Sequence, residues 1–282
     1  MTRDPTWTDE AEVPPLRLGP LGWVRAVLRG IVLALLVFGG LVLLLLLRLI
    51  EKPLHGVHRP WTPFITQFVC RTAFRILGIR YQSHGERMKE PGAVVANHSS
   101  WLDIFALNAE KRVYFVSKDE VASWPGIGWL AKATGTVFIR RDARQAAEQK
   151  RVFEERLTAG HKLLFFPEGT STDGLRVLPF KPTLFAAFFA ENLRDLLWVQ
   201  PVTVVYHAPM GEEPRFYGWW GDMDFGAHLL KTLGASPQGR VEVWWHDPVK
   251  VSDFADRKAL ARHCEAAVRA AHPQAAKAQP IA

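Results

Sequence analysis

A histidine and an aspartate follow an apolar run in the first half of the sequence, at a spacing that suits acid–base chemistry. Val94–Ala96 is apolar, and His98 and Asp103 come soon after it, five positions apart. Five residues of an ideal helix rotate by about 140°, so the two side chains can meet only at a strand-to-helix turn. There Ser99 or Ser100 is expected to cap the helix, and the carboxylate would orient the imidazole and steady the imidazolium. The pair alone fits a structural histidine beside a helix N-terminus equally well.

A second polar turn follows a second apolar run. Residues 163–166 are apolar, and the turn after them contains Glu168, Gly169, Thr170 and Ser171. Ligands of α/β sheets bind beyond the carboxyl ends of the strands, so we expect both turns to face one site. Gly169 would let backbone amides approach a ligand closely, and Glu168 would accept a hydrogen bond from a substrate hydroxyl. The alternative for Glu168 is a carboxylate that satisfies a buried turn.

Basic residues end two further expected strands. Lys118 follows the apolar run at residues 113–117, and Arg140 and Arg141 end the run at residues 136–140. Successive side chains of a strand point to opposite faces, so at most one of the two arginines is expected to reach the site as an anion ligand.

Short apolar runs alternate with longer helical patterns over most of the chain, which predicts an α/β fold with a central, mostly buried sheet flanked by helices. The expected strands are Ala93–Ala96, Arg112–Ser117, Thr136–Arg140, Lys162–Phe166, Trp198–Tyr206 and Arg240–His246. The expected helices are Leu102–Ala109, Gly126–Ala133, Asp142–Thr158, Pro182–Leu193 and Phe254–Ala271.

The N-terminal part of the chain predicts a membrane anchor. Ile31–Leu47 contains no charged residue, and flanking arginines would extend its apolar length to roughly 20 residues. Gly39 and Gly40 would permit a bend or close packing against another helix. Trp61–Tyr81 mixes aromatic and basic residues, which suits the headgroup layer or an ordinary amphipathic helix capping the domain. The expected segments are a disordered basic tail (1–25), a membrane helix (26–50), an interfacial amphipathic segment (51–81), a catalytic domain (82–272) and a disordered tail (273–282).

Composition restricts the partners. The formal net charge is +7, which favours anionic partners, yet the basic residues are spread out and no nucleic-acid-binding motif is present. With an apolar anchor in the same chain, anionic membrane phospholipid is the expected partner, and nucleic acid is not. The two cysteines, Cys70 and Cys264, are far apart in the sequence, so neither a disulfide framework nor a metal site is indicated.

Taken together, these residues resemble the lysophosphatidic acid acyltransferase family, phospholipid/glycerol acyltransferases with an HxxxxD block. Four blocks occur in the family's order, and the likeness covers roughly residues 60–250. They are Asn97–Asp103 (NHxxxxD), Gly135–Arg141 (Gly-x-x-Phe-Ile-x-Arg), Phe166–Thr170 (FPEGT) and the proline-containing apolar segment Val199–Val202.

The resemblance implies a glycerol-3-phosphate acyltransferase-like fold and direct acyl transfer from a thioester to a lipid hydroxyl. His98 would be the general base, oriented by Asp103, and no cofactor is expected beyond acyl carrier protein or coenzyme A carrying the acyl group. Backbone amides near Gly169, or in the first turn after His98, would hold the oxyanion. The implied substrate-binding residues are Asn97, Lys118, Arg141, Glu168, Gly169, Thr170 and Ser171.

The identity of the acceptor lipid depends on one departure from the family pattern. The expected reaction converts 1-acyl-sn-glycerol-3-phosphate to phosphatidic acid, but Ser171 stands where the family most often has a phosphate-binding arginine. The run Phe166–Gly174, with Leu178–Phe180 and Trp219–Met223 after it, looks like the branch that acylates lyso-ornithine lipid, which has no phosphate. Acylation of lyso-ornithine lipid, or of both acceptors, is therefore the alternative.

Two further classes of function fit parts of the sequence. A membrane phospholipid ester hydrolase would use the same His–Asp pair with water, and a non-catalytic lipid-binding protein would not need His98. Because thioester donors are made in the cytoplasm, we expect the catalytic domain on the cytoplasmic face of the inner membrane. The residues expected either to line an acyl groove or to pack in the core are Trp124, Ile127, Trp129, Phe185, Phe188 and Phe189.

Overall fold

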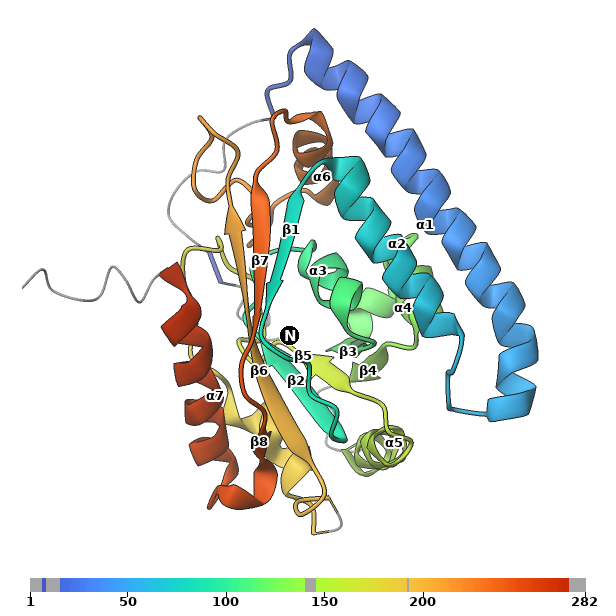
Figure 1. Ribbon diagram of the computed structural model, residues 1–282, viewed down its shortest axis with the longest axis vertical. Helices are drawn as coiled ribbons and strands as arrows, with labels where there is room; N and C mark the ends of the chain where they lie inside the picture. Colours follow the sequence, from blue (N-terminus) through green and yellow to red (C-terminus); the bar gives the residue numbers. More distant parts are fainter. Residues whose placement is uncertain (1–6, 9–15, 140–145, 192, 274–282) are drawn as a thin grey trace, which may run out of the picture.

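The computed structural model describes residues 7–8, 16–139, 146–191 and 193–273. A twisted sheet runs through the molecule, with α7 on one side and α1, α2 and α3 on the other (Figure 1). Alternate side chains of the central strand β2 (Gly92–Ala96) pack into two different buried cores, one on each face of the sheet. Val94 and Ala96 pack with the helices near the N-terminus, whereas Ala93 and Val95 pack with α7 and the aromatic segment after residue 182. This arrangement confirms the expected α/β class.

The sheet is mainly parallel, with strand order β1-β7-β6-β2-β5-β3-β4. Its remaining strands are β1 (Arg80–His84), β3 (Tyr114–Lys118), β4 (Val137–Ile139), β5 (Leu163–Phe165), β6 (Trp198–His207), β7 (Arg240–Trp245) and β8 (Val249–Lys250). Strands β6, β2, β5, β3 and β4 run parallel to one another, while β7 and β8 pair with β6 in the antiparallel sense. The parallel strands therefore place their carboxyl ends at one edge.

The helices agree with the expected ones in place, but some bounds differ. They are α1 (Pro20–His55), α2 (Thr62–Leu77), α3 (Asp103–Glu110), α4 (Ile127–Thr134), α5 (Ala146–Thr158), α6 (Phe225–Gly234) and α7 (Arg257–Ala271). Short 3₁₀ helices are η1 (Asp119–Ser123), η3 (Pro182–Phe189) and η4 (Val251–Asp253). The expected helix Pro182–Leu193 is therefore wrong in type and length. Strands β1 and β8 and helix α6 were not predicted.

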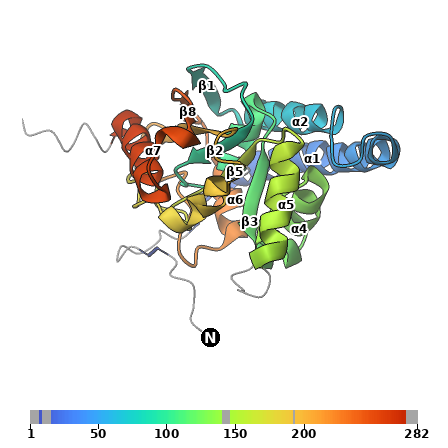
Figure 2. The ribbon, with the colours of Figure 1, turned by 90° about the horizontal axis from the view of Figure 1, so that it is seen from below.

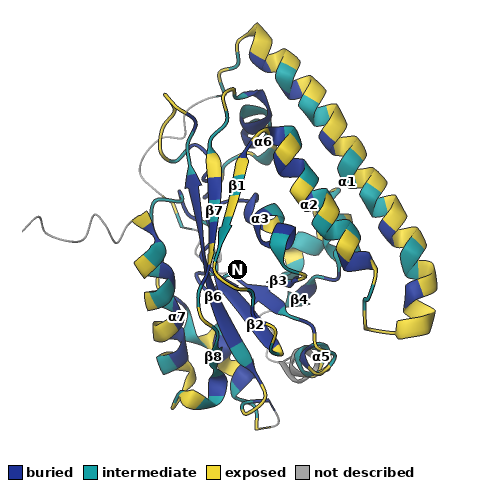
Figure 3. Cartoon of the chain, in the orientation of Figure 1, coloured by how far each residue is buried: buried dark blue, intermediate teal, exposed yellow. Residues whose placement is uncertain are grey.

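Helix α1 lies along the domain and presents an apolar face outward (Figures 1 and 3). Among the described helices it is the one long and apolar enough to cross a membrane. One stripe, including Ala26, Leu33 and Leu44, is buried against the domain, while the remaining large apolar side chains are mostly exposed. At Gly40 a Cβ atom would lie 2.6 Å from Val69 Cγ2 of α2, whereas at Gly39 it would meet nothing within 4 Å. Of the two roles expected for this glycine pair, the structure shows close packing.

Helix α2 carries the amphipathic pattern expected of the segment at residues 61–81. Phe74 and Leu77 are buried in the core, whereas Phe64 and Phe68 are 56% and 62% exposed. Figure 2 shows α2 running beside α1, so the exposed aromatic residues extend the outward apolar surface of α1. The segment therefore both caps the domain and faces outward.

Candidate active site

Side chains that follow three parallel strands converge at one edge of the sheet. His98 follows β2, the turn at residues 166–171 follows β5, and Lys118 is the last residue of β3. Strand β5 lies between β2 and β3, so these ends are neighbours, as expected. The next strand, β4, ends at Ile139. Arg140 and Arg141 lie outside the described residues, so the anion contact expected of Arg141 stays a prediction.

His98 and Asp103 form a hydrogen-bonded pair at the start of α3. His98 Nδ1 lies 2.8 Å from Asp103 Oδ2, and this oxygen also accepts the backbone N–H groups of Ser99 (2.8 Å) and Ser100 (3.0 Å). Asp103 is the first residue of the helix, and Leu102 occupies the cap position without a side-chain cap. The expected serine cap is therefore wrong, because the helix begins after both serines and its first N–H groups donate to the backbone carbonyls of Ser100 and Trp101. The Ser100 hydroxyl accepts the N–H of Leu102 at 3.3 Å, in the turn before the helix.

The surroundings of His98 leave one ring nitrogen for a ligand. Its side chain is 21% exposed, while Asp103 is fully buried. The imidazole stacks on the Phe166 ring, with 4.0 Å between centroids and 10° between planes, and Thr172 donates its N–H to the His98 carbonyl. With Nδ1 donating to a buried carboxylate, Nε2 is the nitrogen that can accept a proton from a hydroxyl.

Tyr206 of β6 lies next to Asp103 of this pair. Its side chain is buried, and burial first, then the charge of Asp103, raise the pKa of the phenol well above 10. The hydroxyl is therefore protonated beside a carboxylate at neutral pH. The sequence alone did not indicate this residue, because 103 positions separate it from Asp103.

Glu168 joins the two polar turns by hydrogen bonds. It is 1% exposed, and its two oxygens accept the N–H groups of His98 and Leu178, each at 2.7 Å. Burial raises the pKa of the Glu168 carboxyl to about 8, while the two backbone donors favour the ionised form. This is the arrangement expected of a carboxylate that satisfies a buried turn. The contact predicted between Glu168 and a substrate hydroxyl is not tested.

Asn97 also forms hydrogen bonds that join two backbone segments. Its side chain is fully buried, accepts the N–H of Val204 at 2.8 Å and donates to the Val204 carbonyl at 2.9 Å. This pairing ties the end of β2 to β6, directly before His98. The predicted contact of Asn97 with substrate stays a prediction.

Gly169 has a backbone conformation that disfavours a side chain, and the end of a lysine side chain lies where its Cβ would be. Its φ is +75°, and a Cβ atom there would lie 2.6 Å from Lys181 Nζ. The Lys181 ammonium therefore lies next to the turn, although no sequence pattern indicated it. Only the fold brings it there, through its N–H bond to the Pro167 carbonyl at 2.9 Å.

The amides of the turn can be divided into used and available donors. The N–H of Gly169 donates to Phe166, and the Ser99 and Ser100 amides donate to Asp103. Three of the amides within the expected set are thus already used. Among the described residues, no acceptor is seen for the N–H groups of Thr170 and Ser171, so these are the better candidates. The Thr170 hydroxyl accepts the N–H of Trp7 at 3.3 Å.

Some of the aromatic side chains expected near the site are buried in the core, and others are exposed on the surface. Phe185 and Phe188 are fully buried in the core with Phe165, as the packing alternative expected. Trp124 is 40% exposed and meets Trp219 edge-on at 6.4 Å. The backbone of Trp219 in turn donates to the Ser99 carbonyl. An aromatic wall therefore reaches the turn that carries His98. The other residues named for an acyl groove are Ile127 and Phe189, which are partly buried, and Trp129, which is exposed.

The cysteines do not offer a nucleophile. Cys70 and Cys264 are buried, and burial raises the pKa of each thiol to about 12. A buried neutral thiol is a poor nucleophile. Within the described ranges, no three His, Cys, Asp or Glu side chains gather as metal ligands.

Comparisons with known proteins agree with this geometry. The acyltransferase family model matches residues 79–205. A lyso-ornithine lipid O-acyltransferase of Rhodobacter capsulatus is 61% identical over 95% of this chain and 97% of its own length. Another, from Brucella abortus, is 38% identical over 74% of this chain and 82% of its own.

Enzymes named as acyltransferases of 1-acyl-sn-glycerol-3-phosphate match a shorter stretch of the chain or at lower identity. A 1-acyl-sn-glycerol-3-phosphate acyltransferase of Neisseria gonorrhoeae is 46% identical, but over 33% of this chain and 36% of its own. The crystal structure of PlsC, the 1-acyl-sn-glycerophosphate acyltransferase of Thermotoga maritima, superposes with a TM-score of 0.62 and 21% identity. It covers 93% of this chain and 97% of that chain, so the two share a fold.

Proposed function

The chain belongs to the acyltransferase family that acts on lysolipids, and we propose that its acceptor is lyso-ornithine lipid. Relatives with that name match most of the chain, whereas the named 1-acyl-sn-glycerol-3-phosphate acyltransferase of Neisseria gonorrhoeae matches a third of it. The comparisons therefore favour the alternative acceptor over phosphatidic acid synthesis, which the sequence first suggested.

The observation that carries the proposed chemistry is the His98–Asp103 pair beside the 166–171 turn. His98 Nε2 takes the proton of the acceptor hydroxyl as its oxygen attacks the thioester carbonyl, and Asp103 stabilises the imidazolium. A carbon–oxygen bond forms and the carbon–sulfur bond breaks. The imidazolium then returns its proton to the departing thiolate, which leaves an ester and a free thiol. This route needs no acyl-enzyme.

The developing negative charge on the carbonyl oxygen requires donors near His98. The N–H groups of Thr170 and Ser171 lie in the turn that Glu168 holds against the His98 amide. We assign the oxyanion to these two donors, because the neighbouring amides already donate to other groups.

The acceptor end of the proposed site departs at Ser171 from the pattern of a phosphate site. Ser171 supplies a hydroxyl at the position where the resemblance expects an arginine, and Lys118 and Lys181 supply cations at this edge of the sheet. An ornithine headgroup is an amino acid with a carboxylate and an ammonium group. A lysine can bind that carboxylate, and no doubly charged phosphate has to be neutralised.

The membrane supplies both the acceptor and the place of reaction. We infer that the outward face of α1, together with Phe64 and Phe68, enters the lipid and holds the site at the bilayer surface. Acyl carrier protein or coenzyme A would then deliver the acyl group from the cytoplasm to the inner membrane.

Product identification tests this proposal. Purified protein in detergent is given a labelled acyl thioester, on acyl carrier protein or on coenzyme A, with lyso-ornithine lipid, lysophosphatidic acid or no acceptor. We expect ornithine lipid as the main product, and none from His98→Ala. Labelled free fatty acid without an acceptor would identify a hydrolase, and phosphatidic acid as the main product would refute the assigned acceptor.

A further inference from the structure

A cavity of about 510 Å³ lies at the opposite edge of the sheet from His98. Its walls come mainly from the end of α1 and the loop after it, the end of α3 and the residues after it, and residues 159–162 after α5. Strand β5 separates Lys162 at this edge from Phe166 at the other, a distance of about 13 Å at about 3.3 Å per residue. A small headgroup bound here does not reach His98, so this is a second site.

The cavity is strongly basic. Its charged lining, besides histidines, consists of Arg59, Arg87, Lys111, Arg112, Lys162 and Glu110. Glu110 forms an ion pair with Arg87, which leaves the other cations without a carboxylate in the lining. Burial first, and then Lys162 and Arg112, lower the pKa of Lys111 to about 8. Cations that disfavour one another in this way are stabilised by a bound anion.

His161 adds a buried donor to the same cavity. The residue is 6% exposed, and its Nδ1 accepts the Nε–H of Arg156 at 2.6 Å. Burial first, and then Arg156 and Arg59, lower the pKa of His161 to about 3, so the ring is neutral and carries its proton on Nε2. This Nε2 is buried, and no described residue accepts its hydrogen bond. A buried donor without a protein acceptor needs an acceptor from water or a ligand, and in the wall of a basic cavity an anion oxygen can supply it.

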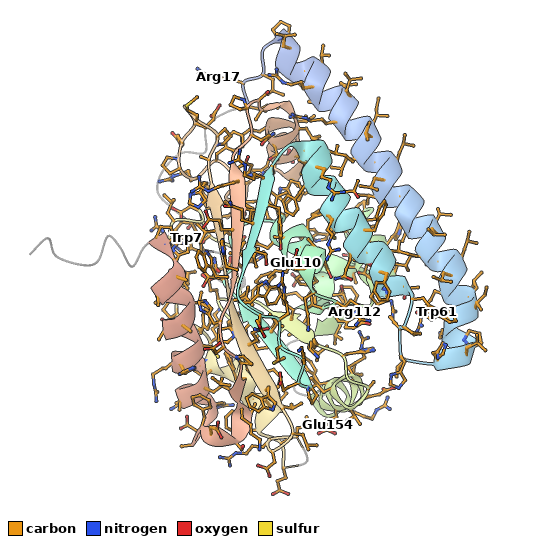
Figure 4. All side chains as sticks on the ribbon, in the orientation of Figure 1. Trp7, Arg17, Trp61, Glu110, Arg112 and Glu154 are labelled. Carbon is orange, nitrogen blue, oxygen red and sulfur yellow. The ribbon has the colours of Figure 1, made fainter. Side chains whose placement is uncertain are left out.

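The cavity borders the outward apolar surface. The Arg112 guanidinium lies 5.0 Å over the ring of Phe64, and His55 meets Trp61 edge-on at 5.0 Å. Both aromatic side chains are exposed, Phe64 by 56% and Trp61 by 40%. Figure 4 shows Trp61 and Arg112 at the end of the α1–α2 pair that is nearest α5. Exposed aromatic residues interleaved with cations are typical of the headgroup layer of a membrane.

We propose that this cavity binds the phosphate of an anionic membrane phospholipid, with its acyl chains lying along α1 and Phe64. The phosphate oxygens would accept from His161 Nε2 and from Arg112 and Lys162. A lipid phosphate and free inorganic phosphate share this chemistry, but only the lipid also uses the adjoining apolar surface. The bound lipid is distinct from the acceptor and would fix how the catalytic domain docks on the bilayer.

Calorimetric titration of the full-length protein in detergent tests the ligand. One arm uses dihexanoyl phosphatidylglycerol, a second uses inorganic phosphate, and a third uses acyl carrier protein. His161→Phe keeps a ring stacked on Tyr114 but removes the donor. We expect phosphatidylglycerol to bind more tightly than phosphate, and His161→Phe to weaken it at least tenfold. Equal affinity for phosphate, or binding of acyl carrier protein alone that His161→Phe weakens, would overturn the assignment of a lipid.

A matched pair of variants separates a defined site from diffuse surface charge. Arg112→Gln/Lys162→Gln removes two cations from the cavity, whereas Lys52→Gln/Arg75→Gln removes two exposed cations of α1 and α2 outside it. Flotation with phosphatidylcholine vesicles, with and without phosphatidylglycerol, measures binding, and acyl transfer in detergent confirms folding. We expect the cavity variant alone to lose the preference for phosphatidylglycerol. Equal loss in both variants would refute a defined site.

Discussion

At the scale of single residues, His98 is positioned from three sides. Asp103 holds its Nδ1, Glu168 accepts its backbone N–H, and Phe166 stacks on its ring. Asp103 belongs to α3, and Phe166 and Glu168 belong to the turn after β5, so the imidazole cannot turn without breaking a contact to one of these two segments. This fixes Nε2 as the reacting nitrogen.

We expect His98→Ala to lower kcat by about 10²–10⁴-fold, because a general base typically contributes that much. Asp103→Asn should give a loss of the same order, since an amide cannot stabilise the imidazolium and leaves amides of Ser99 or Ser100 poorly paired. Steady-state kinetics measures both, with vesicle binding as the control. Activity of His98→Ala within a few-fold of the parent would refute the assigned base.

Gly169→Ala should abolish most activity. Its new Cβ would displace Lys181 and strain a turn with φ of +75°. Gly211→Ala is the matched control, because Gly211 has φ of +87° but no atom within 4 Å of the added carbon. Both variants should lose about 1 kcal/mol or more of stability, while only Gly169→Ala should lose activity. Comparable kcat values would mean that the turn does not contact the reacting groups.

At the scale of elements, α1 packs closely against Val69 of α2 at Gly40. Gly40→Leu would force α1 away from Val69, whereas Gly39→Leu points a side chain into open space. We expect Gly40→Leu to lower the melting temperature in detergent and to reduce activity on vesicles, and Gly39→Leu to do neither. Identical melting curves would show that α1 is not packed on α2 in solution.

Helix α6 should make stability depend on pH through His228. This buried side chain accepts the indole N–H of Trp101 at 2.9 Å, and burial first, then Lys231, lower its pKa to about 3. An unfolded histidine has a pKa of about 6.5, so between these values only the unfolded state binds the proton. Stability therefore falls as pH falls below about 6.5, by about 1.4 kcal/mol per pH unit.

Denaturant titrations at pH 7.5, 6.0 and 5.0 measure this slope. His228→Gln should be less stable at pH 7.5 but should show a flatter dependence on pH. His161 and His272, whose pKa values are also lowered by burial, contribute a slope of the same sign. Glu168, whose pKa is raised to about 8, contributes a slope of the opposite sign, because there the folded state binds the proton. An unchanged slope in His228→Gln would exclude this histidine as its source.

The elements around the site were predictable from sequence because their signals are local. The buried strands β2 and β5 are short apolar runs, and polar residues directly follow each. Strand β1 has the sequence Arg-Tyr-Gln-Ser-His and no fully buried residue, so no apolar run marks it. Its pairing with β7 joins residues 160 positions apart, which no local pattern indicates.

The residues of the site also divide into those that a local sequence pattern indicates and those that only the fold brings there. His98, Asp103 and Glu168 lie within recognisable blocks, whereas Lys181 and Tyr206 reach the site only through the fold. Glu168 and Asn97 were expected to contact substrate, but their hydrogen bonds go to backbone groups. A sequence block therefore marks the site without separating residues that hold it together from residues that touch the ligand.

At the scale of the whole molecule, the protein has two proposed sites, and both contain cationic side chains. The proposed acceptor site lies at the carboxyl edge of the sheet, and the basic cavity lies at the opposite edge near Trp61. Docking through the cavity would orient the domain, while the acceptor enters from the same bilayer. Membrane binding and acceptor choice should therefore respond to different substitutions.

The most direct measurement is the ratio of kcat/KM for lyso-ornithine lipid and lysophosphatidic acid, in the parent protein and in Ser171→Arg. We predict at least a tenfold preference for lyso-ornithine lipid in the parent, and a shift toward lysophosphatidic acid in Ser171→Arg, because the added guanidinium pairs with phosphate. A parent protein that prefers lysophosphatidic acid would contradict the account and return this enzyme to phosphatidic acid synthesis.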